Sequence, residues 1–387
     1  MNSTRGGTGE TAGANLPAVR SHNTALVLDL LRTAGVDGIS RLELAERTWL
    51  TPQAVSKITA RLREAGLATE AGRRASTGGK PRTVLRLVPE AGHAVGAHLD
   101  RDELRAVLVD LTGTVVGERR APLDLGAGAE AVVAAVAREV EGLVGEAGGP
   151  GAGAGSARGT GFLPGVNSLL GVGVALPGPL DHTHGVLHRV TGFPEWDGFP
   201  LQDALGRRLG VPVVVDKDTN AAALGLAVGG EGGSFAYLHL GTGLGAGLVI
   251  GGSVHRGART GAGEFGHQVI QLDGPPCGCG NRGCIEALCL AAVARDDVAE
   301  AARVLGAGAA NLVGLLDIDL VLLGGRIVAA DPEPFVRGVA AVLDERARRE
   351  GAFEAAVPVR VASGGTRGVA EGAAQLLLGP LFGRTDG

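Results

Sequence analysis

The chain has 387 residues, enough for two or three domains with separate cores, and a formal net charge of −5. Aromatic residues make up only 3% of it, so the cores must be built from Val, Leu, Ile and Ala. Its apolar runs end well before the roughly 20 residues that a membrane helix needs, which argues against a membrane protein. With no recognisable targeting segment and only four cysteines, we expect a cytoplasmic protein.

Charge is divided unevenly along the chain. Residues 1–90 contain 13 Lys and Arg against 8 Asp and Glu, a net charge of +5, which leaves 23 against 33, a net charge of −10, for the remainder. A basic amino-terminal segment favours a nucleic-acid-binding module. The acidic body to which it is attached should not bind the phosphate backbone of a nucleic acid.

Three helices are predicted near the amino terminus, after a Gly- and Thr-rich segment, residues 1–17, that we expect to be disordered. Apolar residues recur at helical spacing over residues 20–32. Ser40 and Glu43 have the spacing of a capping box at the start of a second helix. Thr51 is a suitable cap for a third helix, with Pro at its first position and Gly66 at its end.

A basic hairpin is predicted after these helices, with strands near residues 67–70 and 83–88. Three helices and a basic hairpin predict a winged helix-turn-helix domain over residues 18–90, although a small helical bundle that contacts other proteins is an alternative. In a DNA-binding domain, the exposed start of the third helix reads bases and the hairpin contacts the DNA backbone or minor groove. The base-reading candidates are Gln53, Ser56 and Lys57, and the backbone candidates are Arg73, Arg74, Lys80 and Arg82.

The remaining chain alternates strands with helices, which predicts an α/β body. Apolar runs at 95–99, 105–111 and 114–119 predict an opening antiparallel meander. A helix over 128–145 and a flexible Gly-rich loop over 148–165 should follow. Further strands are expected near 169–176, 211–215, 235–240, 245–250 and 320–323, and helices near 201–209, 301–316 and 369–378.

One histidine and three cysteines lie close together in the second half of the chain. His267, Cys277, Cys279 and Cys284 supply one imidazole and three thiolates, a complete ligand set for a tetrahedral structural zinc ion. Disulfide bonds are the alternative, but Cys277 and Cys279 are too close in sequence to bridge comfortably, and the chain shows no sign of secretion. Cys289 is expected to be a small buried apolar residue.

The block from Gly263 to Glu286 resembles the signature of the ROK family, which contains repressors and sugar kinases, and the resemblance extends from about residue 20 onward. It implies a two-lobed body of the actin and hexokinase type, a ribonuclease H-like fold. Lobe 1 would span 91–216 and lobe 2 would span 217–365, with a terminal helix within 366–382 packing back on lobe 1. The resemblance also implies that the histidine and three cysteines hold zinc and that Glu264, His267 and Glu286 contact a sugar between the lobes.

Other positions of the resemblance concern catalysis. Asp218 stands where the family kinases have the aspartate that deprotonates a sugar hydroxyl, although a helix N-cap is an alternative role. The second phosphate-binding turn remains as Gly241, Thr242 and Gly243. The first turn reads Asp100-Arg101-Asp102-Glu103-Leu104, without glycine, and its carboxylates should repel the phosphates of ATP. We therefore expect that this chain is not a kinase.

Two departures affect the sugar pocket. Lys217 replaces an Asn that often contacts sugar in the family, and Gly192 lies in a stretch that lacks another such Asn. We therefore expect Glu264 and Glu286 to lack their usual partners. The segment after Cys289 is also shorter than in most family members, which weakens any inherited statement about lobe closure.

Three hypotheses follow. The first is a transcriptional regulator, a repressor, that binds operator DNA as a homodimer or homotetramer and responds to a sugar, sugar derivative or sugar phosphate in the cleft. The second is an ATP-dependent hexose kinase with an attached DNA-binding domain, which Asp218 and the Gly241 turn favour and residues 100–104 oppose. The third is a DNA-binding oligomer whose body has lost its ligand, which Lys217, Gly192 and the shortened segment after Cys289 favour.

Overall fold

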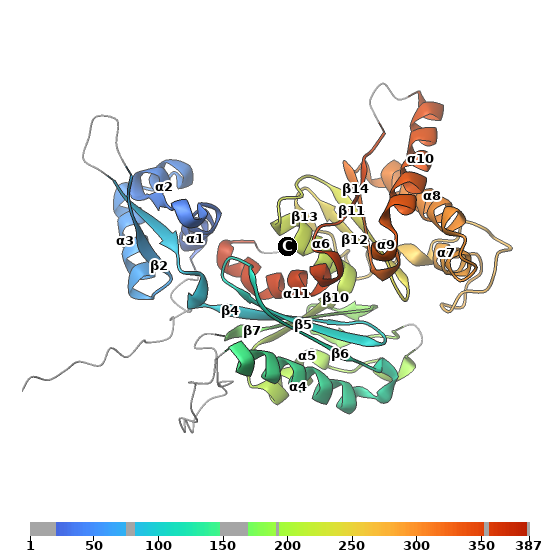
Figure 1. Ribbon diagram of the computed structural model, residues 1–387, viewed down its shortest axis with the longest axis horizontal. Coiled ribbons are helices and arrows are strands. Elements are labelled where there is room, and N and C mark those ends of the chain that lie inside the picture. Colours follow the sequence, from blue (N-terminus) through green and yellow to red (C-terminus); the bar gives the residue numbers. More distant parts are fainter. Residues whose placement is uncertain (1–20, 75–81, 148–168, 191–192, 352–355, 385–387) are drawn as a thin grey trace, which may run out of the picture.

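A computed structural model describes residues 21–74, 82–147, 169–190, 193–351 and 356–384. The tail predicted over 1–17, the loop predicted over 148–165 and Lys80 lie outside these ranges. Figure 1 shows a small domain at one end of the molecule and a larger body with two sheets, one in each lobe.

The small domain contains three capped helices and a three-stranded sheet in the order β1-β3-β2. The predicted capping box is confirmed, because the Ser40 hydroxyl accepts from the Glu43 amide at 3.3 Å and the Glu43 carboxylate accepts from the Ser40 amide at 2.8 Å. Thr51 likewise accepts from the Ala54 amide at 3.2 Å. The elements are α1 (His22–Thr33), β1 (Ile39–Ser40), α2 (Arg41–Thr48), α3 (Pro52–Glu64), β2 (Ala68–Arg74) and β3 (Arg82–Leu87).

The first lobe is a five-stranded sheet in the order β10-β7-β4-β5-β6. β4, β5 and β6 form the predicted antiparallel meander, and β7 and β10 add to it in parallel. Helices α4 and α5 bury their apolar faces on one side of this sheet. The elements are β4 (His93–Leu99), β5 (Glu103–Asp110), β6 (Val115–Pro122), α4 (Ala129–Ala147), β7 (Leu169–Leu176), β8 (Leu180–Asp181), β9 (Val186–Leu187), α5 (Leu201–Leu209) and β10 (Val213–Lys217).

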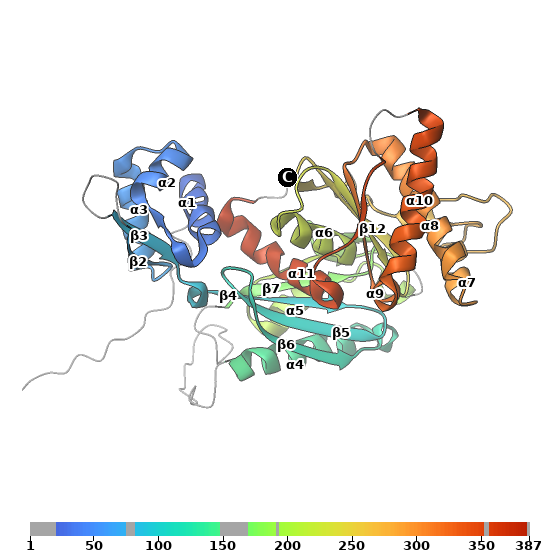
Figure 2. The ribbon, with the colours of Figure 1, turned by 45° about the horizontal axis from the view of Figure 1, so that its top comes forward.

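Helix α11 (Gly368–Leu378) covers the other side of the lobe 1 sheet and continues to the small domain. It lies very close to the strands, because a Cβ atom at Gly96 would stand 1.9 Å from the carbonyl oxygen of Ala370. Only glycine permits this approach. Beyond α11, the ring of Phe382 lies 5.0 Å from the guanidinium carbon of Arg32 in α1, and Phe382 shares one apolar core with the small domain. Figure 2 shows α11 running from the body to α1.

The second lobe is a five-stranded sheet in the order β13-β12-β11-β14-β15. Alternate residues of β11 face opposite sides, so Leu238 packs with α7, α8 and α10 while Phe235 packs with α6. Helix α8 is long and apolar enough to cross a membrane, but 50% of its apolar window is buried and it packs against α7 and α10 as a core helix. The elements are α6 (Asp218–Val228), β11 (Phe235–Leu240), β12 (Leu244–Ile250), β13 (Ser253–Val254), α7 (Ile285–Val293), α8 (Val298–Leu316), β14 (Leu320–Gly324), α9 (Arg326–Ala330), α10 (Pro332–Glu350) and β15 (Val359–Val361).

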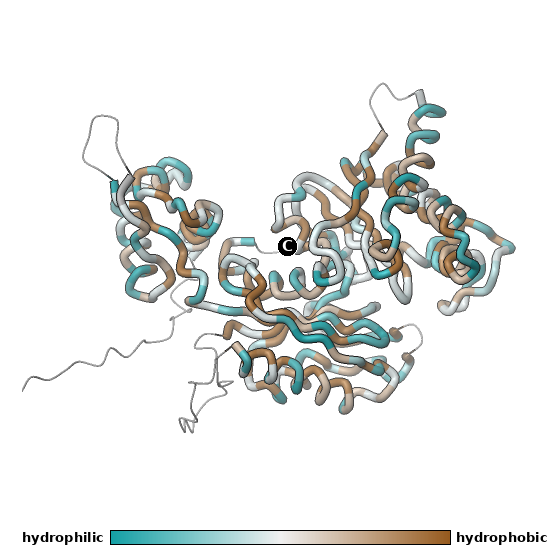
Figure 3. The backbone as a smooth tube through the Cα atoms, viewed as in Figure 1, coloured by the Kyte–Doolittle hydropathy of each residue, from teal (hydrophilic) through white to brown (hydrophobic). Residues whose placement is uncertain are grey.

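The polar ends of the lobe 1 strands meet lobe 2. The turn between β4 and β5 contains Asp100, Arg101 and Asp102, and it lies next to the turn between β11 and β12. Figure 3 shows β5 and β6 as hydrophilic at this end and hydrophobic toward the small domain. Charged residues therefore gather where the two lobes face each other.

Candidate functional site

The predicted zinc ligands come together in the structure. The ligand atoms of His267, Cys277, Cys279 and Cys284 all lie within 4.8 Å of one another. Cys277 Sγ is 3.8 Å from His267 Nδ1, and Cys279 Sγ is 3.7 Å from Cys284 Sγ. Two thiolates bound tetrahedrally to zinc at about 2.3 Å stand about 3.8 Å apart, so this spacing fits a shared metal ion. A disulfide, with sulfur atoms about 2.05 Å apart, does not fit it.

The local backbone explains how these ligands converge. A tight turn closed by the Cys277 amide and the Asn281 carbonyl, 2.8 Å apart, carries Cys277 and Cys279. Gly283 has φ +67°, and a Cβ atom there would stand 1.6 Å from the Gln271 carbonyl oxygen, so a glycine is required before Cys284. Cys284 then occupies the N-cap position of α7, which brings Glu286 into the first turn of that helix.

Cys289 takes no part in this cluster. It is fully buried in the lobe 2 core, its thiol donates to the Ala301 carbonyl at 3.5 Å, and burial raises its pKa to about 12. The expectation of a small buried apolar residue is confirmed.

A cavity of about 80 Å³ lies between the lobes and is lined by all four predicted sugar-binding residues. Asp218 comes from the start of α6, Glu264 and His267 from the loop after β13, and Glu286 from α7. The other lining residues are Asp100, Arg101, Pro177, Gly178, Lys217, Thr219, His239, Thr242, Gly243, Leu244, Gly245 and Gly263. His267 therefore belongs to both the cavity and the metal-type cluster.

The alternative role of Asp218 as a helix N-cap is wrong. Lys217 stands at the N-cap position of α6, without a side-chain capping bond, and Asp218 is the first helical residue. Its carboxylate accepts from the Thr219 amide at 2.6 Å and lies near the positive end of the helix dipole, where a negative charge is favourable.

Lys217 gives Glu264 a partner that the sequence did not reveal. The side chain of Lys217 is only 4% exposed, and its ammonium group donates to the Ala262 carbonyl and to Glu264 Oε1, the latter at 3.2 Å. Glu286 is partnered as well, because its carboxylate accepts from the Leu244 amide at 2.8 Å. Both glutamates therefore have partners, but these are not the Asn side chains that are usual in the family.

The second phosphate-type turn is occupied by lobe 1. The Thr242 hydroxyl donates to Asp100 Oδ1 at 2.7 Å, and the Gly241 amide donates to the Gly243 carbonyl within the turn itself. Burial alone would raise the pKa of Asp100, but hydrogen bonds from Thr242 and from the Arg101 amide outweigh burial and lower that pKa. Asp100 is therefore a carboxylate at neutral pH.

A second contact links the same two turns. Arg326, at the start of α9, donates to both oxygens of Asp102 at 2.9 and 3.0 Å. Both side chains are about half exposed, 44% and 60%, so this ion pair should be weak and sensitive to salt. The residues that replace the first glycine turn thus hold lobe 1 against lobe 2.

A buried polar network, which no sequence pattern indicated, supports the floor of the cavity. Asp216, 2% exposed at its side chain, accepts from Arg256 Nε at 2.8 Å, from Asn220 Nδ2 at 2.9 Å and from the Lys217 amide at 2.7 Å. Arg256 is also buried. Because Asp216 precedes Lys217 and Asp218, this network fixes the backbone that carries both cavity residues.

Two histidines lie beside the cavity on the central strands of the two lobes. The rings of His98 and His239 have centroids 6.3 Å apart, and the Tyr237 hydroxyl is 2.9 Å from His239 Nδ1. Nε2 of His98 is buried and has no hydrogen-bond partner within the described part of the chain. Burial lowers the pKa of His98 and outweighs the opposing effect of the Asp218 carboxylate, so His98 is neutral at pH 7.

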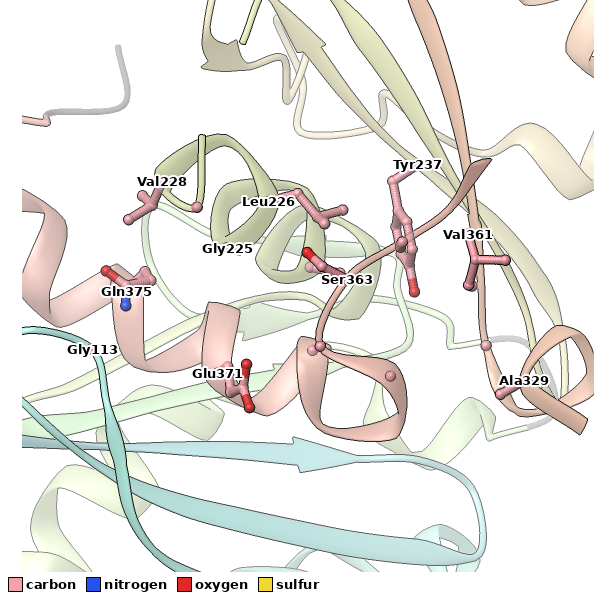
Figure 4. A pocket seen from close by; sticks show the side chains of 18 of the residues that line it. Gly113, Gly225, Leu226, Val228, Tyr237, Ala329, Val361, Ser363, Glu371 and Gln375 are labelled. Carbon is pink, nitrogen blue, oxygen red and sulfur yellow. The ribbon is translucent and has the colours of Figure 1, made fainter. Parts of the chain in front are cut away.

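A larger cavity, of about 240 Å³, lies between α6, α11 and the end of β15. Figure 4 shows Glu371 and Gln375 of α11 at its lower edge and Tyr237 of β11 beside Val361. Burial raises the pKa of Glu371, although the nearby Arg367 acts in the opposite direction. The cavity therefore separates parts of α11 from lobe 2. It also reaches Arg32 of α1, so it borders the small domain.

Six of the seven candidate DNA-contacting residues lie in the described part of the small domain. Gln53, Ser56 and Lys57 are exposed on the first two turns of α3. Arg82 is exposed at the start of β3, and Arg73 and Arg74 lie in β2. Lys80 is outside the described residues.

Comparison with known proteins gives consistent matches. The model of the ROK family matches residues 163–291. The xylose repressor of Caldicellulosiruptor bescii is 30% identical over 64% of this chain and 59% of its own length, so the match spans less than two thirds of that relative. A ROK family transcriptional regulator, a homologue of Escherichia coli Mlc, has the same fold, with a TM-score of 0.72 over 94% of this chain and 97% of its own, at 21% identity. A ROK hexokinase from Thermus thermophilus is 31% identical, with a TM-score of 0.56 over 73% of this chain and 96% of its own.

Proposed function

This chain belongs to the ROK family, and we propose that it is a sequence-specific DNA-binding regulator, a repressor, that responds to a sugar or sugar derivative held between its lobes. The choice of a regulator over a kinase rests on the glycine-free first turn, whose Asp100 accepts a hydrogen bond from Thr242 of the second phosphate-type turn. In a kinase this turn would receive phosphates, whereas here its hydroxyl is engaged by a carboxylate. That negative charge opposes the binding of ATP.

The interlobe cavity is the proposed sensor. Carboxylates such as Asp218, Glu264 and Glu286 suit the hydroxyl groups of a sugar, because each oxygen accepts hydrogen bonds. A sugar that engages Glu264 must compete with Lys217, which belongs to the last strand of lobe 1. Binding would therefore exchange a contact between the lobes for contacts to the ligand, and this gives the ligand a preference for one lobe arrangement.

Zinc is the metal that the His267 cluster fits best. Three thiolates and one imidazole form a closed tetrahedral set, which is typical of structural rather than catalytic zinc. In this proposal the metal would fix the loop that carries His267 and the cap of α7, and so hold Glu264 and Glu286 at the cavity.

The small domain would bind operator DNA through the exposed residues at the start of α3 and the basic hairpin. The positive charge of residues 1–90 supports this assignment, since phosphate contacts supply much of the affinity for DNA. Operators for such domains are commonly paired half-sites, so the proposal includes a homodimer or homotetramer that works in the cytoplasm.

Helix α11 would connect the two sites. Its glycine-lined contact with β4 makes it rigid with lobe 1, its end packs with α1 through Phe382, and the larger cavity leaves space along its other side. A change in lobe arrangement could thus alter the orientation of the small domain. By linkage, DNA and sugar would change each other's affinity by the same factor.

One observation favours a competing function. The ammonium group of Lys217 already binds Glu264 inside the cavity, as it would in a DNA-binding oligomer that has lost its ligand. The kinase alternative is favoured by the position of Asp218, by the glycine turn that begins at Gly241 and by the 31% identity to a ROK hexokinase.

Titration of the purified protein onto fluorescent DNA from upstream of its own gene tests the proposal. We expect tighter binding than to a scrambled duplex of equal length and composition, at the same salt concentration. Equal binding to both duplexes would contradict sequence-specific regulation, and the absence of binding would contradict any DNA-binding function.

A further inference from the structure

Trp49 has an unusual conformation in the turn between α2 and α3. It has φ 57° and ψ 22°, a left-handed conformation in which a tryptophan is strained, and its side chain is 93% exposed. Within the described part of the chain it makes no hydrogen bond, ring stack or cation–π contact. Neither the fold nor the core therefore explains a large aromatic residue where glycine would be free of strain.

The surroundings of Trp49 match the chemistry of DNA. It lies two residues before Thr51, the cap of the proposed recognition helix, and close in sequence to the base-reading candidates. In helix-turn-helix complexes the first helix crosses the DNA backbone and the start of the second enters the major groove, so this turn lies next to phosphates. The other exposed residues between 46 and 57 are polar except for one proline: Glu46, Arg47, Thr51, Pro52, Gln53, Ser56 and Lys57.

A contact with another protein fits these surroundings less well. Such surfaces are normally continuous apolar patches, whereas the exposed residues nearest to Trp49 in sequence, from 46 to 57, are polar or charged apart from one proline. A sugar–phosphate backbone offers both an apolar sugar face and anionic oxygens. An indole can match these with its ring and with its one N–H donor.

We propose that Trp49 binds the DNA backbone beside the recognition helix, with its ring against a deoxyribose and its Nε1–H donating to a phosphate oxygen. This inference rests on the proposed DNA-binding function. DNA contact would account for the strained conformation of Trp49. Because this contact is with the backbone, it should strengthen binding to duplex DNA of any sequence.

Tryptophan fluorescence provides a direct test, because the chain has only two tryptophans. Trp196 is 1% exposed and donates to the Leu125 carbonyl at 3.0 Å, so acrylamide should quench only Trp49 in the free protein. Sheared mixed-sequence duplex DNA at low salt serves as the probe, since backbone contacts need no particular sequence. We expect DNA to protect the quenchable emission and Trp49→Phe to remove that protected component.

A Trp49→Gly variant separates the binding role from a structural one. It should bind the same DNA about five- to tenfold more weakly, the effect of losing about one hydrogen bond and its packing, while its melting temperature stays the same or rises because the strain is relieved. Leu315→Ala, at a residue 80% exposed on α8, is the control and should leave DNA affinity unchanged.

Several results would overturn the inference. If the protein binds DNA but acrylamide still quenches Trp49, or if Trp49→Gly binds DNA like the parent, Trp49 does not contact DNA. If Trp49 of the free protein is already protected from acrylamide, and the parent sediments with a larger mass than Trp49→Gly, Trp49 instead contacts a second copy of the chain. A parent protein that binds no DNA would instead refute the proposed function itself.

Discussion

Asp216→Asn should be among the most damaging conservative substitutions in the body. The two side chains of the Asp216–Arg256 pair are 2% and 7% exposed, and the carboxylate also accepts from Asn220 and the Lys217 amide. Asparagine keeps the shape and one accepting oxygen. Its amide nitrogen, however, would replace the oxygen that now faces Arg256 Nε at 2.8 Å, so two donors would meet in a buried place.

The expected cost follows from the loss of a buried charge partner. Removing one member of a buried ion pair commonly costs about 3–5 kcal/mol, because the remaining charge stays buried. We expect about 3 kcal/mol here, since the size of the side chain is unchanged and no cavity forms. For a body of this size that corresponds to a melting temperature lower by about 5 °C.

Thermal and urea denaturation, followed by far-ultraviolet circular dichroism, measures this effect. The matched control is Glu141→Gln, which breaks the exposed pair with Arg208 and should cost less than about 1 kcal/mol. Adding Arg256→Met to Asp216→Asn should recover part of the loss, because both charges are then removed. The reasoning is refuted if Asp216→Asn and Glu141→Gln lower stability equally.

Three further predictions concern metal, pH and nucleotide. Cys279→Ser should lower the zinc content of the purified protein, whereas Cys289→Ser should leave it unchanged; equal zinc in both variants would contradict the assigned ligands. Burial lowers the pKa of His98 in the folded protein, so its contribution to stability is present above the unfolded pKa near 6.5 and is lost as pH falls below it. The melting temperature of the His98→Asn variant should therefore fall less than that of the parent between pH 7 and pH 5. An equal fall in both proteins would contradict this assignment. Incubation with ATP and a panel of hexoses should release no sugar-dependent ADP, and a measurable turnover would favour the kinase.

The features predicted correctly from sequence depend on residues close together in the chain. The capping box needs only Ser40 and Glu43, and the four proposed metal ligands lie within 18 residues, from His267 to Cys284. The body fold followed from a family resemblance rather than from local patterns. A TM-score of 0.72 with the Mlc homologue agrees with that fold.

The features that the sequence did not reveal join distant residues. Asp100 meets Thr242 142 positions later, and Asp216 meets Arg256 40 positions later. No local periodicity signals such pairs, because they form only after the two lobes pack. Lys217 illustrates the same limit: in sequence it looked like the loss of a sugar contact, whereas in the structure its ammonium group takes a place beside Glu264.

The central claim is that a sugar in the interlobe cavity changes DNA binding. The most direct measurement is the affinity for the upstream DNA in the presence of individual pentoses, hexoses, N-acetylhexosamines and their phosphates, by fluorescence anisotropy at fixed salt. We predict that at least one of them changes the dissociation constant fivefold or more and that Glu286→Gln, in the cavity, reduces this change. Sequence-specific DNA binding that no sugar alters would contradict the claim and favour a body without a ligand.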